Sequence, residues 1–443
     1  MSSRKICPEC NQKSDEYGWC RPCNSKHLQY NFNNWTSEND KIDKFIQDAQ
    51  LNANKNWEVI EWIPFKRFKD VKKIGKGGFG TIYYARWIDG YIEKWDFENR
   101  QWERYYKEVE VALKKFDNFV NFNDVLNEIE IHLKIYNVRD ASIRFYGITQ
   151  DPDTHSYMMV LEYAADGNLR EYLKINFNNI NWEQKLDNLY YLSFKLMNIH
   201  ELDIVHHDFH PGNILSTSFK SEGIMISDFG LSKLIGANPN NPEKKNIFGV
   251  LPYIAPEVLS GEEYTKAADV YSFGIIAYEI VTGFPPYSGI PHDKGLALKI
   301  CNGLRPGIPF RTPKLITRII MRCWDARVTH RPTVKELYNE LWKCYDDYYW
   351  YLNEGGNNDS EIVIQIENSE KLSEYLGSIN STTPLNYQTH PQAIYTSRLL
   401  NFSKLPKPKN EENFESELEE LTKSTSDLSI GDSGIIGLDM SNF

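Results

Sequence analysis

The stretch HHDFHPGN, at His206–Asn213, brings three histidines, an aspartate and an asparagine into eight consecutive residues. Three histidines first suggest a metal site, but a zinc site requires convergent side chains and a fourth ligand. The neighbouring Asp208 and Asn213 gain other roles from motifs that lie elsewhere in the chain. We therefore expect no histidine metal site here, and we expect His206 to brace this loop in the core.

The composition of the 443 residues narrows the class of protein. The length predicts about two to three domains. The formal net charge of −11 argues against a nucleic-acid-binding or membrane-binding surface, since both require a positive potential, and favours proteins and small ligands as partners. No secretory signal and no run of about 18 apolar residues is present, and the seven cysteines form no disulfide framework. We expect an intracellular, cytoplasmic chain in a reducing compartment.

Composition divides the chain into four regions. They are a cysteine module at 1–27, a polar connector at 28–62, a globular part at 65–347, and an acidic tail at 355–443 that is predicted to be largely disordered. In the connector, the spacing of apolar residues predicts an amphipathic helix capped by Thr36 or Ser37. In the tail, the segment AIYTSRLLNFSKLPKPKN at 393–410 is either a docking segment or an ordinary apolar cluster.

The cysteine module contains CPEC at 7–10 and CRPC at 20–23. Each two-residue spacing aims two thiolates at one ion, and four thiolates complete a tetrahedral, structural zinc site. So short a segment buries too little apolar surface to fold alone, so that zinc would supply its folding energy. The alternatives are reduced cysteines in an unstructured terminus and a redox role, which lacks a βαβ context. The predicted ligands are Cys7, Cys10, Cys20 and Cys23.

A glycine-rich motif, KKIGKGGFGTIYYA at 72–85, lies between two strand-like runs. Glycines allow backbone N–H groups to approach phosphate oxygens closely. A dinucleotide-binding fold requires a helix directly after the glycines, whereas TIYYARW predicts a second strand. The motif therefore favours a hairpin that covers a nucleotide, although GxGxxG alone also marks any glycine-rich hairpin.

Lys114 lies in the apolar strand VALKKF and needs an anionic partner if its side chain points inward. A phosphate group would serve as that partner. The helix predicted in VLNEIEIHLKI offers Glu128, which follows Val125 by three residues, with Glu130 as a competitor. The alternative for the lysine and the glutamate, each taken singly, is a solvated surface position.

Taken together, these motifs resemble one family. GKGGFG, VALK, HHDFHPGN, DFG at 228–230, APE at 255–257 and DVYSFG at 269–274 occur in the order typical of eukaryotic protein kinase domains. The resemblance covers residues 65–347 and implies an α+β, two-lobed fold with a small β-rich N-lobe, a larger helical C-lobe and ATP between them. Cys323–Trp324 and Arg331–Pro332 resemble the tyrosine-kinase-like branch. The zinc-ribbon-like module and the WTSEN connector are similar to a kinase family expanded in some fungi.

The resemblance implies a role for each matched residue in ATP-dependent phosphoryl transfer. Asp208 would orient the substrate hydroxyl and accept its proton, and Lys114, held by Glu128, would grip the α- and β-phosphates. Asn213 and Asp228 would hold Mg²⁺, with Mn²⁺ as an alternative ion. The implied ATP-binding residues are Ile74, Gly75, Lys76, Gly77, Gly78, Phe79, Gly80, Ile82, Ala112, Lys114, Leu161, Glu162, Tyr163, Ala164, Asn168 and Leu215.

Three further expectations concern the structure of the globular part. Glu257 and Arg331 would form a buried ion pair that pins the substrate-binding segment. Leu161 would be the gatekeeper, and its medium size predicts intermediate access to a back pocket. The stretch at 88–108 is longer than a usual hairpin loop and predicts an extra hairpin, whose aromatic residues either face a partner or pack within the chain.

The activation segment departs from the family pattern. His207 replaces the usual arginine before the catalytic aspartate, so the guanidinium that would clamp a phosphate is missing. The only hydroxyl residues between Asp228 and Glu257 are Ser232 and Tyr253, both near the ends of the segment. The segment thus lacks both a residue that would bind a phosphate group and a well-placed hydroxyl that would carry one. We therefore expect activity that needs no activation-loop phosphate.

Two other departures concern the phosphoacceptor. His210 stands where serine/threonine kinases carry a lysine, and it could donate a hydrogen bond as part of the catalytic set. Val250 stands where these kinases carry a threonine, and the tryptophan typical of tyrosine kinases is also absent. We expect a serine/threonine protein kinase in signal transduction. The alternatives are a tyrosine or dual-specificity kinase, and a pseudokinase or adaptor that binds ATP, or partners through the zinc module and tail, without turnover.

Overall fold

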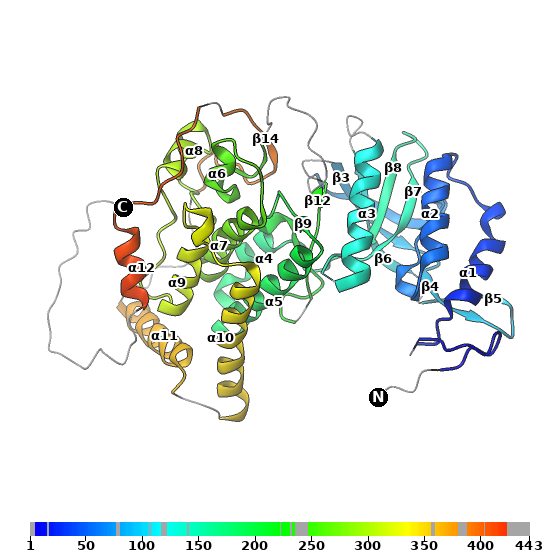
Figure 1. Cartoon of the computed structure of the whole chain (residues 1–443), viewed down its shortest axis with the longest axis horizontal. Helices are drawn as coiled ribbons and strands as arrows, with labels where there is room; N and C mark the ends of the chain where they lie inside the picture. Colours follow the sequence, from blue (N-terminus) through cyan, green and yellow to red (C-terminus); the bar gives the residue numbers. More distant parts are fainter. Residues whose placement is uncertain are drawn as a thin grey trace.

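The chain folds into two lobes, a β-sheet with flanking helices and a larger helical lobe (Figure 1). The computed structural model describes residues 5–15, 17–76, 80–105, 108–116, 122–139, 141–221, 223–230, 233–234, 247–355, 359–379, 388–402 and 404–422. The N-terminal module lies at the outer end of the first lobe, and the last described residues, in α12 (Phe414–Thr422), lie on the second lobe. The architecture is therefore the α+β, two-lobed one that the sequence predicts.

The N-lobe is built on a six-stranded sheet. Its elements are α1 (Arg21–Tyr30), α2 (Asp40–Asn52), β1 (Glu61–Trp62), β2 (Phe68–Lys76), β3 (Gly80–Trp87), β4 (Tyr91–Asp96), β5 (Gln101–Tyr105), β6 (Val109–Phe116), α3 (Phe122–Arg139), β7 (Phe145–Gln150) and β8 (Tyr157–Glu162). The sheet order is β1-β7-β8-β6-β3-β2, and only β1 and β7 are parallel neighbours. Alternation along β6 buries Val111 and Leu113 on one face and turns Lys114 toward α3 on the other. Gly80 is required at the start of β3, because a Cβ there would lie 2.1 Å from the carbonyl oxygen of Lys115.

The connector forms α2, which packs in the same apolar cluster as α3. Ile42 and Ile46 are buried in this cluster, as their spacing predicts. The helix begins two residues later than expected from Ser37, because the N-cap is Asn39 and not Thr36 or Ser37. The Asn39 side chain accepts hydrogen bonds from two N–H groups of the first turn, which otherwise would have no partner. The connector is thus part of the N-lobe core.

The predicted extra hairpin is present as β4 and β5, and it packs on the cysteine module of the same chain. The ring of Trp95 stacks on that of His27 in α1, with centroids 3.9 Å apart. The rings of Trp102 and Trp19 stack at 5.9 Å. Of the two alternatives left by the sequence, packing within the chain therefore accounts for these aromatic side chains, and it fixes the cysteine module to the N-lobe.

The C-lobe packs around one central helix. Its elements are α4 (Leu169–Asn176), α5 (Trp182–Glu201), β9 (Ile204–Val205), β10 (Ile214–Ser216), β11 (Ile224–Ile226), β12 (Lys233–Leu234), β13 (Ile247–Gly249), α6 (Pro256–Leu259), α7 (Lys266–Thr282), α8 (Lys294–Cys301), α9 (Lys314–Cys323) and α10 (Val334–Glu354). Helix α7 is buried along almost its whole length, which fits its apolar sequence on all sides. Gly274 lets α9 approach α7, since a Cβ at this position would lie 2.7 Å from the Cβ of Cys323. Helix α10 continues to Glu354, past the predicted domain end at 347.

The tail differs from the expectation of disorder at 355–443. Its described residues form α11 (Glu361–Ile379), β14 (Arg398–Leu400) and α12 (Phe414–Thr422). Ile366, Leu400 and Phe414 are buried in the C-lobe core. A few apolar residues suffice to order this polar tail, because the stability of a helix comes mainly from packing on an existing core and not from intrinsic propensity. Among the residues that the structure describes, no helix is both long and apolar enough to cross a bilayer.

Candidate active site

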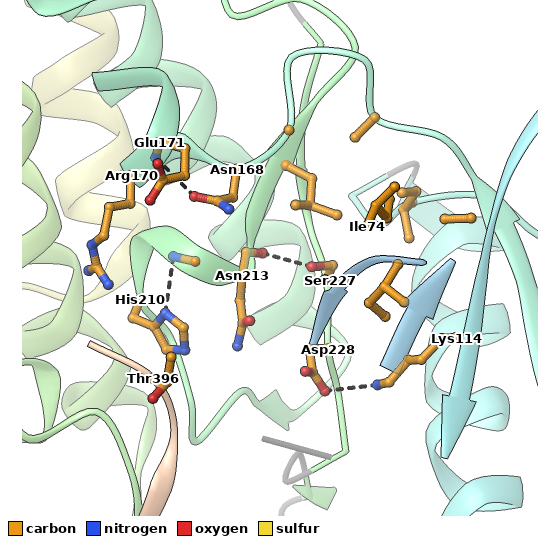
Figure 2. A pocket seen from close by; sticks show the side chains of 18 of the residues that line it. Ile74, Lys114, Asn168, Arg170, Glu171, His210, Asn213, Ser227, Asp228 and Thr396 are labelled. Atoms are coloured by element: carbon orange, nitrogen blue, oxygen red, sulfur yellow. Dashed lines mark hydrogen bonds and ion pairs between the residues drawn. The ribbon is translucent and has the colours of Figure 1, made fainter. Parts of the chain in front are cut away.

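A cavity of about 730 Å³ lies between the lobes (Figure 2). It brings together most residues of the predicted ATP site. Those that line it are Ile74, Gly75, Lys76, Gly80, Ile82, Ala112, Lys114, Leu161, Glu162, Tyr163, Ala164, Asn168 and Leu215. The remaining three, Gly77, Gly78 and Phe79, lie outside the described residues. The cavity is also lined by residues that sequence reasoning did not place there, among them Tyr395 and Ser397 of the tail.

A buried ammonium group lies at the inner end of this cavity. Nζ of Lys114 is 2.5 Å from Oε1 of Glu128 and 3.0 Å from Oδ1 of Asp228. The predicted pairing with Glu128 is therefore confirmed, while Glu130 is exposed on α3. Burial alone would lower the pKa of Lys114, but the carboxylates of Asp228 and Glu128 raise it well above its usual value. The site therefore holds a permanently charged cation.

Asp228 faces this cation from the DFG motif. Burial raises the pKa of its carboxyl group, but the nearby ammonium of Lys114 outweighs burial and lowers it below its ordinary value. The backbone of Asp228 has a φ of 64°, which is uncommon for a residue other than glycine. Such a conformation persists only where surrounding contacts enforce it. The carboxylate is thus ionised at neutral pH and held in place.

The loop His206–Asn213 is held from two sides. The backbone N–H of His206 donates to Oδ2 of Asp269 at 2.9 Å, and that of His207 donates to Oδ1 at 3.3 Å. The Nδ2 group of Asn213 donates to the carbonyl oxygen of Asp208 at 2.9 Å. Asp269, from the DVYSFG motif, is the residue that fixes the loop, and sequence reasoning gave it no role. The sequence did contain a clue to this role, because an aspartate in an otherwise apolar helix requires polar partners when it is buried.

His206 braces the loop in the core, as predicted. Its side chain is fully buried, and burial lowers its pKa. A neutral ring fits its contacts, because Nε2 lies 3.0 Å from the carbonyl oxygen of Ser227 and Nδ1 accepts from the N–H of Asp208 at 3.3 Å. A neutral histidine donates from one ring nitrogen and accepts at the other. The three histidines therefore form no metal site. Among the described residues, the one cluster of side chains that could hold a metal ion is formed by the cysteines of the N-terminal module.

The other two histidines point in different directions. His207 stacks on the ring of Tyr264, with centroids 4.6 Å apart. His210 is buried, and its Nδ1 accepts from the N–H of Gly212 at 3.0 Å (Figure 2). Its Nε2 lies 3.6 Å from Oδ1 of Asp208. His210 therefore lies beside the reactive aspartate, whereas His207 contacts the segment that precedes α7.

Two buried ion pairs hold the segment below the cavity. Arg331 contacts Glu257 through two hydrogen bonds of 2.7 Å, so the predicted pair is confirmed. Arg170 contacts Glu279 at 3.3 Å, and the hydroxyl of Tyr253 donates to the same carboxylate. Tyr253 is 2% exposed and thus inaccessible in this form. Ser232, the other hydroxyl residue of the segment, lies outside the described residues.

The four cysteines of the N-terminal module converge on one point. Their Sγ atoms all lie within 4.8 Å of one another, with 3.8 Å between Cys7 and Cys23 and 3.5 Å between Cys10 and Cys20. A tetrahedral ion with bonds of about 2.3 Å separates its ligands by about 3.8 Å. The arrangement therefore fits a zinc ion with four thiolate ligands.

Comparison with known proteins adds an independent finding. A family model described as protein tyrosine and serine/threonine kinase matches residues 68–341. A protein of Acanthamoeba polyphaga mimivirus, named as a serine/threonine-protein kinase/receptor, is 29% identical over 308 residues, which cover 68% of this chain and 17% of that protein. The dual specificity protein kinase pyk3 of Dictyostelium discoideum is 26% identical over 313 residues, which cover 69% of this chain and 21% of that protein. The tyrosine-protein kinase SPK-1 of Girardia tigrina is 26% identical over 304 residues, which cover 67% of this chain and 54% of that protein. The chain thus spans less than two thirds of each of these relatives.

Proposed function

The chain belongs to the protein tyrosine and serine/threonine kinase family, and we propose that it transfers the γ-phosphoryl group of ATP to serine or threonine hydroxyls of proteins. One observation carries the proposal. The buried ammonium of Lys114 and two oxygen donors, from Asn213 and Asp228, line the cavity although they come from separate parts of the chain. The buried carboxylate of Asp208 lies next to them, because Asn213 is hydrogen-bonded to the backbone of Asp208. Phosphoryl transfer requires such positioning and charge neutralisation more than covalent chemistry by the protein.

The ATP phosphates would lie near Lys114. Its ammonium is fixed by Glu128, so a phosphate oxygen meets a cation that needs no reorganisation. In the free form, Asp228 completes the neutralisation of the lysine. Binding of a nucleotide would replace part of that interaction.

Asn213 and Asp228 would hold the magnesium ions. An amide oxygen and a carboxylate are hard donors of the kind that Mg²⁺ prefers. The Nδ2 group of Asn213 is engaged with Asp208, which leaves the amide oxygen as the atom offered to a metal. When bound, the metal neutralises charge on the phosphate oxygens.

Asp208 would orient the acceptor hydroxyl and take its proton. Its carboxylate is 4% exposed and already accepts a hydrogen bond from a hydroxyl group of the same chain. His210, with Nε2 beside this carboxylate, would hold the acceptor oxygen on the same side. The hydroxyl that reaches Asp208 belongs to a serine, which supports serine/threonine specificity over tyrosine specificity.

We further propose that turnover needs no activation-loop phosphate. His207 offers an imidazole stacked on Tyr264 in place of a phosphate-binding guanidinium. The loop is instead held by Asp269, and the substrate-binding segment by the pair of Glu257 and Arg331. Neither contact includes Ser232 or Tyr253, the hydroxyl residues between Asp228 and Glu257.

The N-terminal module is proposed to hold one structural zinc ion and to offer, with the tail, a surface for protein partners. It contacts the β4–β5 hairpin and lies at the end of the N-lobe that is far from the helices of the C-lobe (Figure 1). Placement in the tyrosine-kinase-like branch, the likeness to the expanded fungal family, a signalling role and a cytoplasmic location all stay predictions.

The test is transfer of radiolabelled phosphate from Mg·ATP to randomised peptide libraries that contain serine, threonine or tyrosine. We expect transfer to serine or threonine by the wild-type chain and loss of at least about 10²-fold in Asp208→Asn, the order of magnitude of one general base. Nucleotide binding, measured by thermal shift, should survive in Asp208→Asn. Equal signals from both proteins would instead identify a pseudokinase that binds ATP without turnover.

A further inference from the structure

A segment of the tail lies against the reactive aspartate. Residues 388–402 run along the C-lobe to β14, which pairs antiparallel with β13 of the activation segment (Figure 1). In this register Gly249 faces Arg398 and Ile247 faces Leu400. The two strands form a two-stranded sheet of their own, and backbone pairing of an extended segment with a strand is a common mode of peptide recognition.

The residue just before β14 meets the catalytic loop. The hydroxyl of Ser397 donates to Oδ2 of Asp208 at 2.5 Å and lies 3.1 Å from Nε2 of His210. A distance of about 2.5–2.7 Å is that of a hydroxyl hydrogen-bonded to an ionised carboxylate. A general base must reach the proton it removes over a distance of this size. Ser397 therefore occupies the place that the acceptor of a phosphoryl group would take.

The segment is held on the C-lobe by its backbone. Arg170 donates to the carbonyl oxygen of Tyr395 at 2.9 Å, and its guanidinium lies 4.6 Å from the centre of the Tyr395 ring. The N–H of His292 donates to the carbonyl oxygen of Gln392 at 2.9 Å. On the far side of Ser397, Leu400 is 4% exposed and belongs to the C-lobe core. Contacts on both sides thus fix the serine in position.

We propose that Ser397 is a phosphorylation site of this kinase, modified within the same chain, and that residues 388–402 block protein substrates until this modification occurs. The inference rests on the proposed kinase activity and names its first substrate. The segment is tethered next to the site, so its effective concentration exceeds that of free protein substrates. It also pairs with β13, so the backbone groups of that strand are occupied and not open to an extended substrate.

The reaction is the ordinary transfer from ATP. Oγ of Ser397 forms a bond to the γ-phosphorus as the bond from that phosphorus to the bridging oxygen of the β-phosphate breaks, and ADP leaves. The proton of Oγ passes to Asp208 and from there to solvent. The product carries about −1.5 to −2 charges at pH 7. It lies beside the carboxylate of Asp208, and repulsion between like charges releases the segment.

The first experiment locates the phosphate. The full chain is dephosphorylated, freed of phosphatase and incubated with Mg·ATP, and phosphorylated residues are mapped by mass spectrometry over time. We expect phosphate at Ser397, with a rate constant that stays unchanged over a tenfold dilution, because the transfer is intramolecular. Ser416→Ala, a matched change in α12, should behave as the wild type, whereas Ser397→Ala should lack this phosphate.

The second experiment measures release through the KM for a peptide substrate. Ser397→Glu, and the wild type after incubation with Mg·ATP, should have a KM about tenfold lower than Ser397→Ala, because a negative charge at position 397 is repelled by the carboxylate of Asp208 and the methyl group of alanine is not. At saturating peptide the kcat values should agree, because Ser397 is not part of the catalytic machinery.

The outcomes separate this inference from the proposed function. If the peptide is phosphorylated while Ser397 stays unmodified, or if Ser397 is modified at a rate proportional to protein concentration, the intramolecular site is wrong and the kinase activity stands. If KM is the same in Ser397→Glu and Ser397→Ala, the block is wrong. If neither the peptide nor Ser397 accepts phosphate, the proposed function fails and this inference fails with it.

Discussion

The guanidinium of Arg331 contacts the carboxylate of Glu257 through two hydrogen bonds of 2.7 Å, although 74 residues separate them in the chain. The same guanidinium donates to the carbonyl oxygens of Asp325 and Ala267, at 2.8 and 2.9 Å. Both charged side chains are almost fully buried. This contact ties α6, which follows the activation segment, to the start of α10, and only an arginine has the planar set of donors that it requires.

Replacement of Arg331 by methionine should lower the free energy of unfolding by about 3–5 kcal/mol, because it leaves the Glu257 carboxylate buried without its partner. The measurement is urea unfolding followed by fluorescence. Arg86→Met is the control, since Arg86 is 40% exposed and its partners Asp70 and Glu108 are 48% and 43% exposed, and such surface pairs contribute at most about 1 kcal/mol. Equal losses in the two variants would contradict a special role for the buried pair.

Glu128→Gln should lower kcat by roughly 10²-fold with little loss of folding. The neutral amide would hold Lys114 less firmly, and a displacement of about 1 Å at a reacting group costs a factor of this size. The measurement is the steady-state rate of peptide phosphorylation. Glu130→Gln is the matched control, because this side chain is exposed on the same helix, and it should retain the wild-type rate. A loss of activity in both variants would point to α3 as a whole.

Stability should fall below about pH 6.5 because of His132. This buried residue of α3 accepts or donates a hydrogen bond at 2.8 Å with Ser142, and its ring contacts that of Phe229. Burial, with a smaller contribution from Lys114, lowers its pKa to about 3. The unfolded chain binds a proton near pH 6.5, whereas the folded chain does so only near 3. The stabilising effect of the neutral ring is therefore complete above about pH 6.5 and is lost as the pH falls toward 3.

The measurement for His132 is the free energy of unfolding at pH 7.5, 6.5 and 5.5. In His132→Gln the decline below pH 6.5 should be smaller than in the wild type by on the order of 1 kcal/mol per pH unit. The exposed His330 provides the control, and His330→Gln should keep the wild-type slope. An unchanged slope in His132→Gln would show that His132 does not titrate in this range.

The purified chain should contain one zinc ion, and Cys20→Ser should contain none. Loss of the ion should unfold the cysteine module and change the fluorescence of Trp19, which is 4% exposed and stacked on Trp102. Metal content is measured by atomic absorption. Cys344→Ser, a change in α10, should keep the zinc, and phosphoryl transfer should persist in both variants. Zinc retained in Cys20→Ser would show that this thiol is not a ligand.

Activity should survive removal of phosphate from the activation segment. The experiment uses the Ser397→Ala variant, because it has no hydroxyl at position 397 and phosphatase treatment can then change only phosphate groups at other positions. Phosphatase treatment should leave its rate at saturating peptide unchanged, because the loop is held by Asp269 and not by a phosphate. A loss of activity that maps to a phosphate between 232 and 253 would refute this expectation.

Local sequence patterns sufficed for the core of the candidate site. The three-residue step from Val125 favoured Glu128 over Glu130, because residues at this spacing share one face of a helix, and the ion pair of Lys114 confirms the choice. The two CxxC motifs identified four sulfurs that do converge. The turn from glycines into a strand excluded a dinucleotide fold. In each case the information lies within a few residues of the position concerned.

The tertiary structure decided what depends on the meeting of distant surfaces. Ser397 reaches Asp208 across 189 residues, and Trp95 stacks on His27 because a hairpin of the N-lobe meets the N-terminal module. The polar tail resembles a disordered segment in composition, yet Leu400 finds an apolar core already formed by other helices. The sequence by itself determined which residues can perform the chemistry, because their types and local spacing are visible in the chain. Which hydroxyl lies at the carboxylate depends on shape and burial across the whole fold, and no local pattern contains that information.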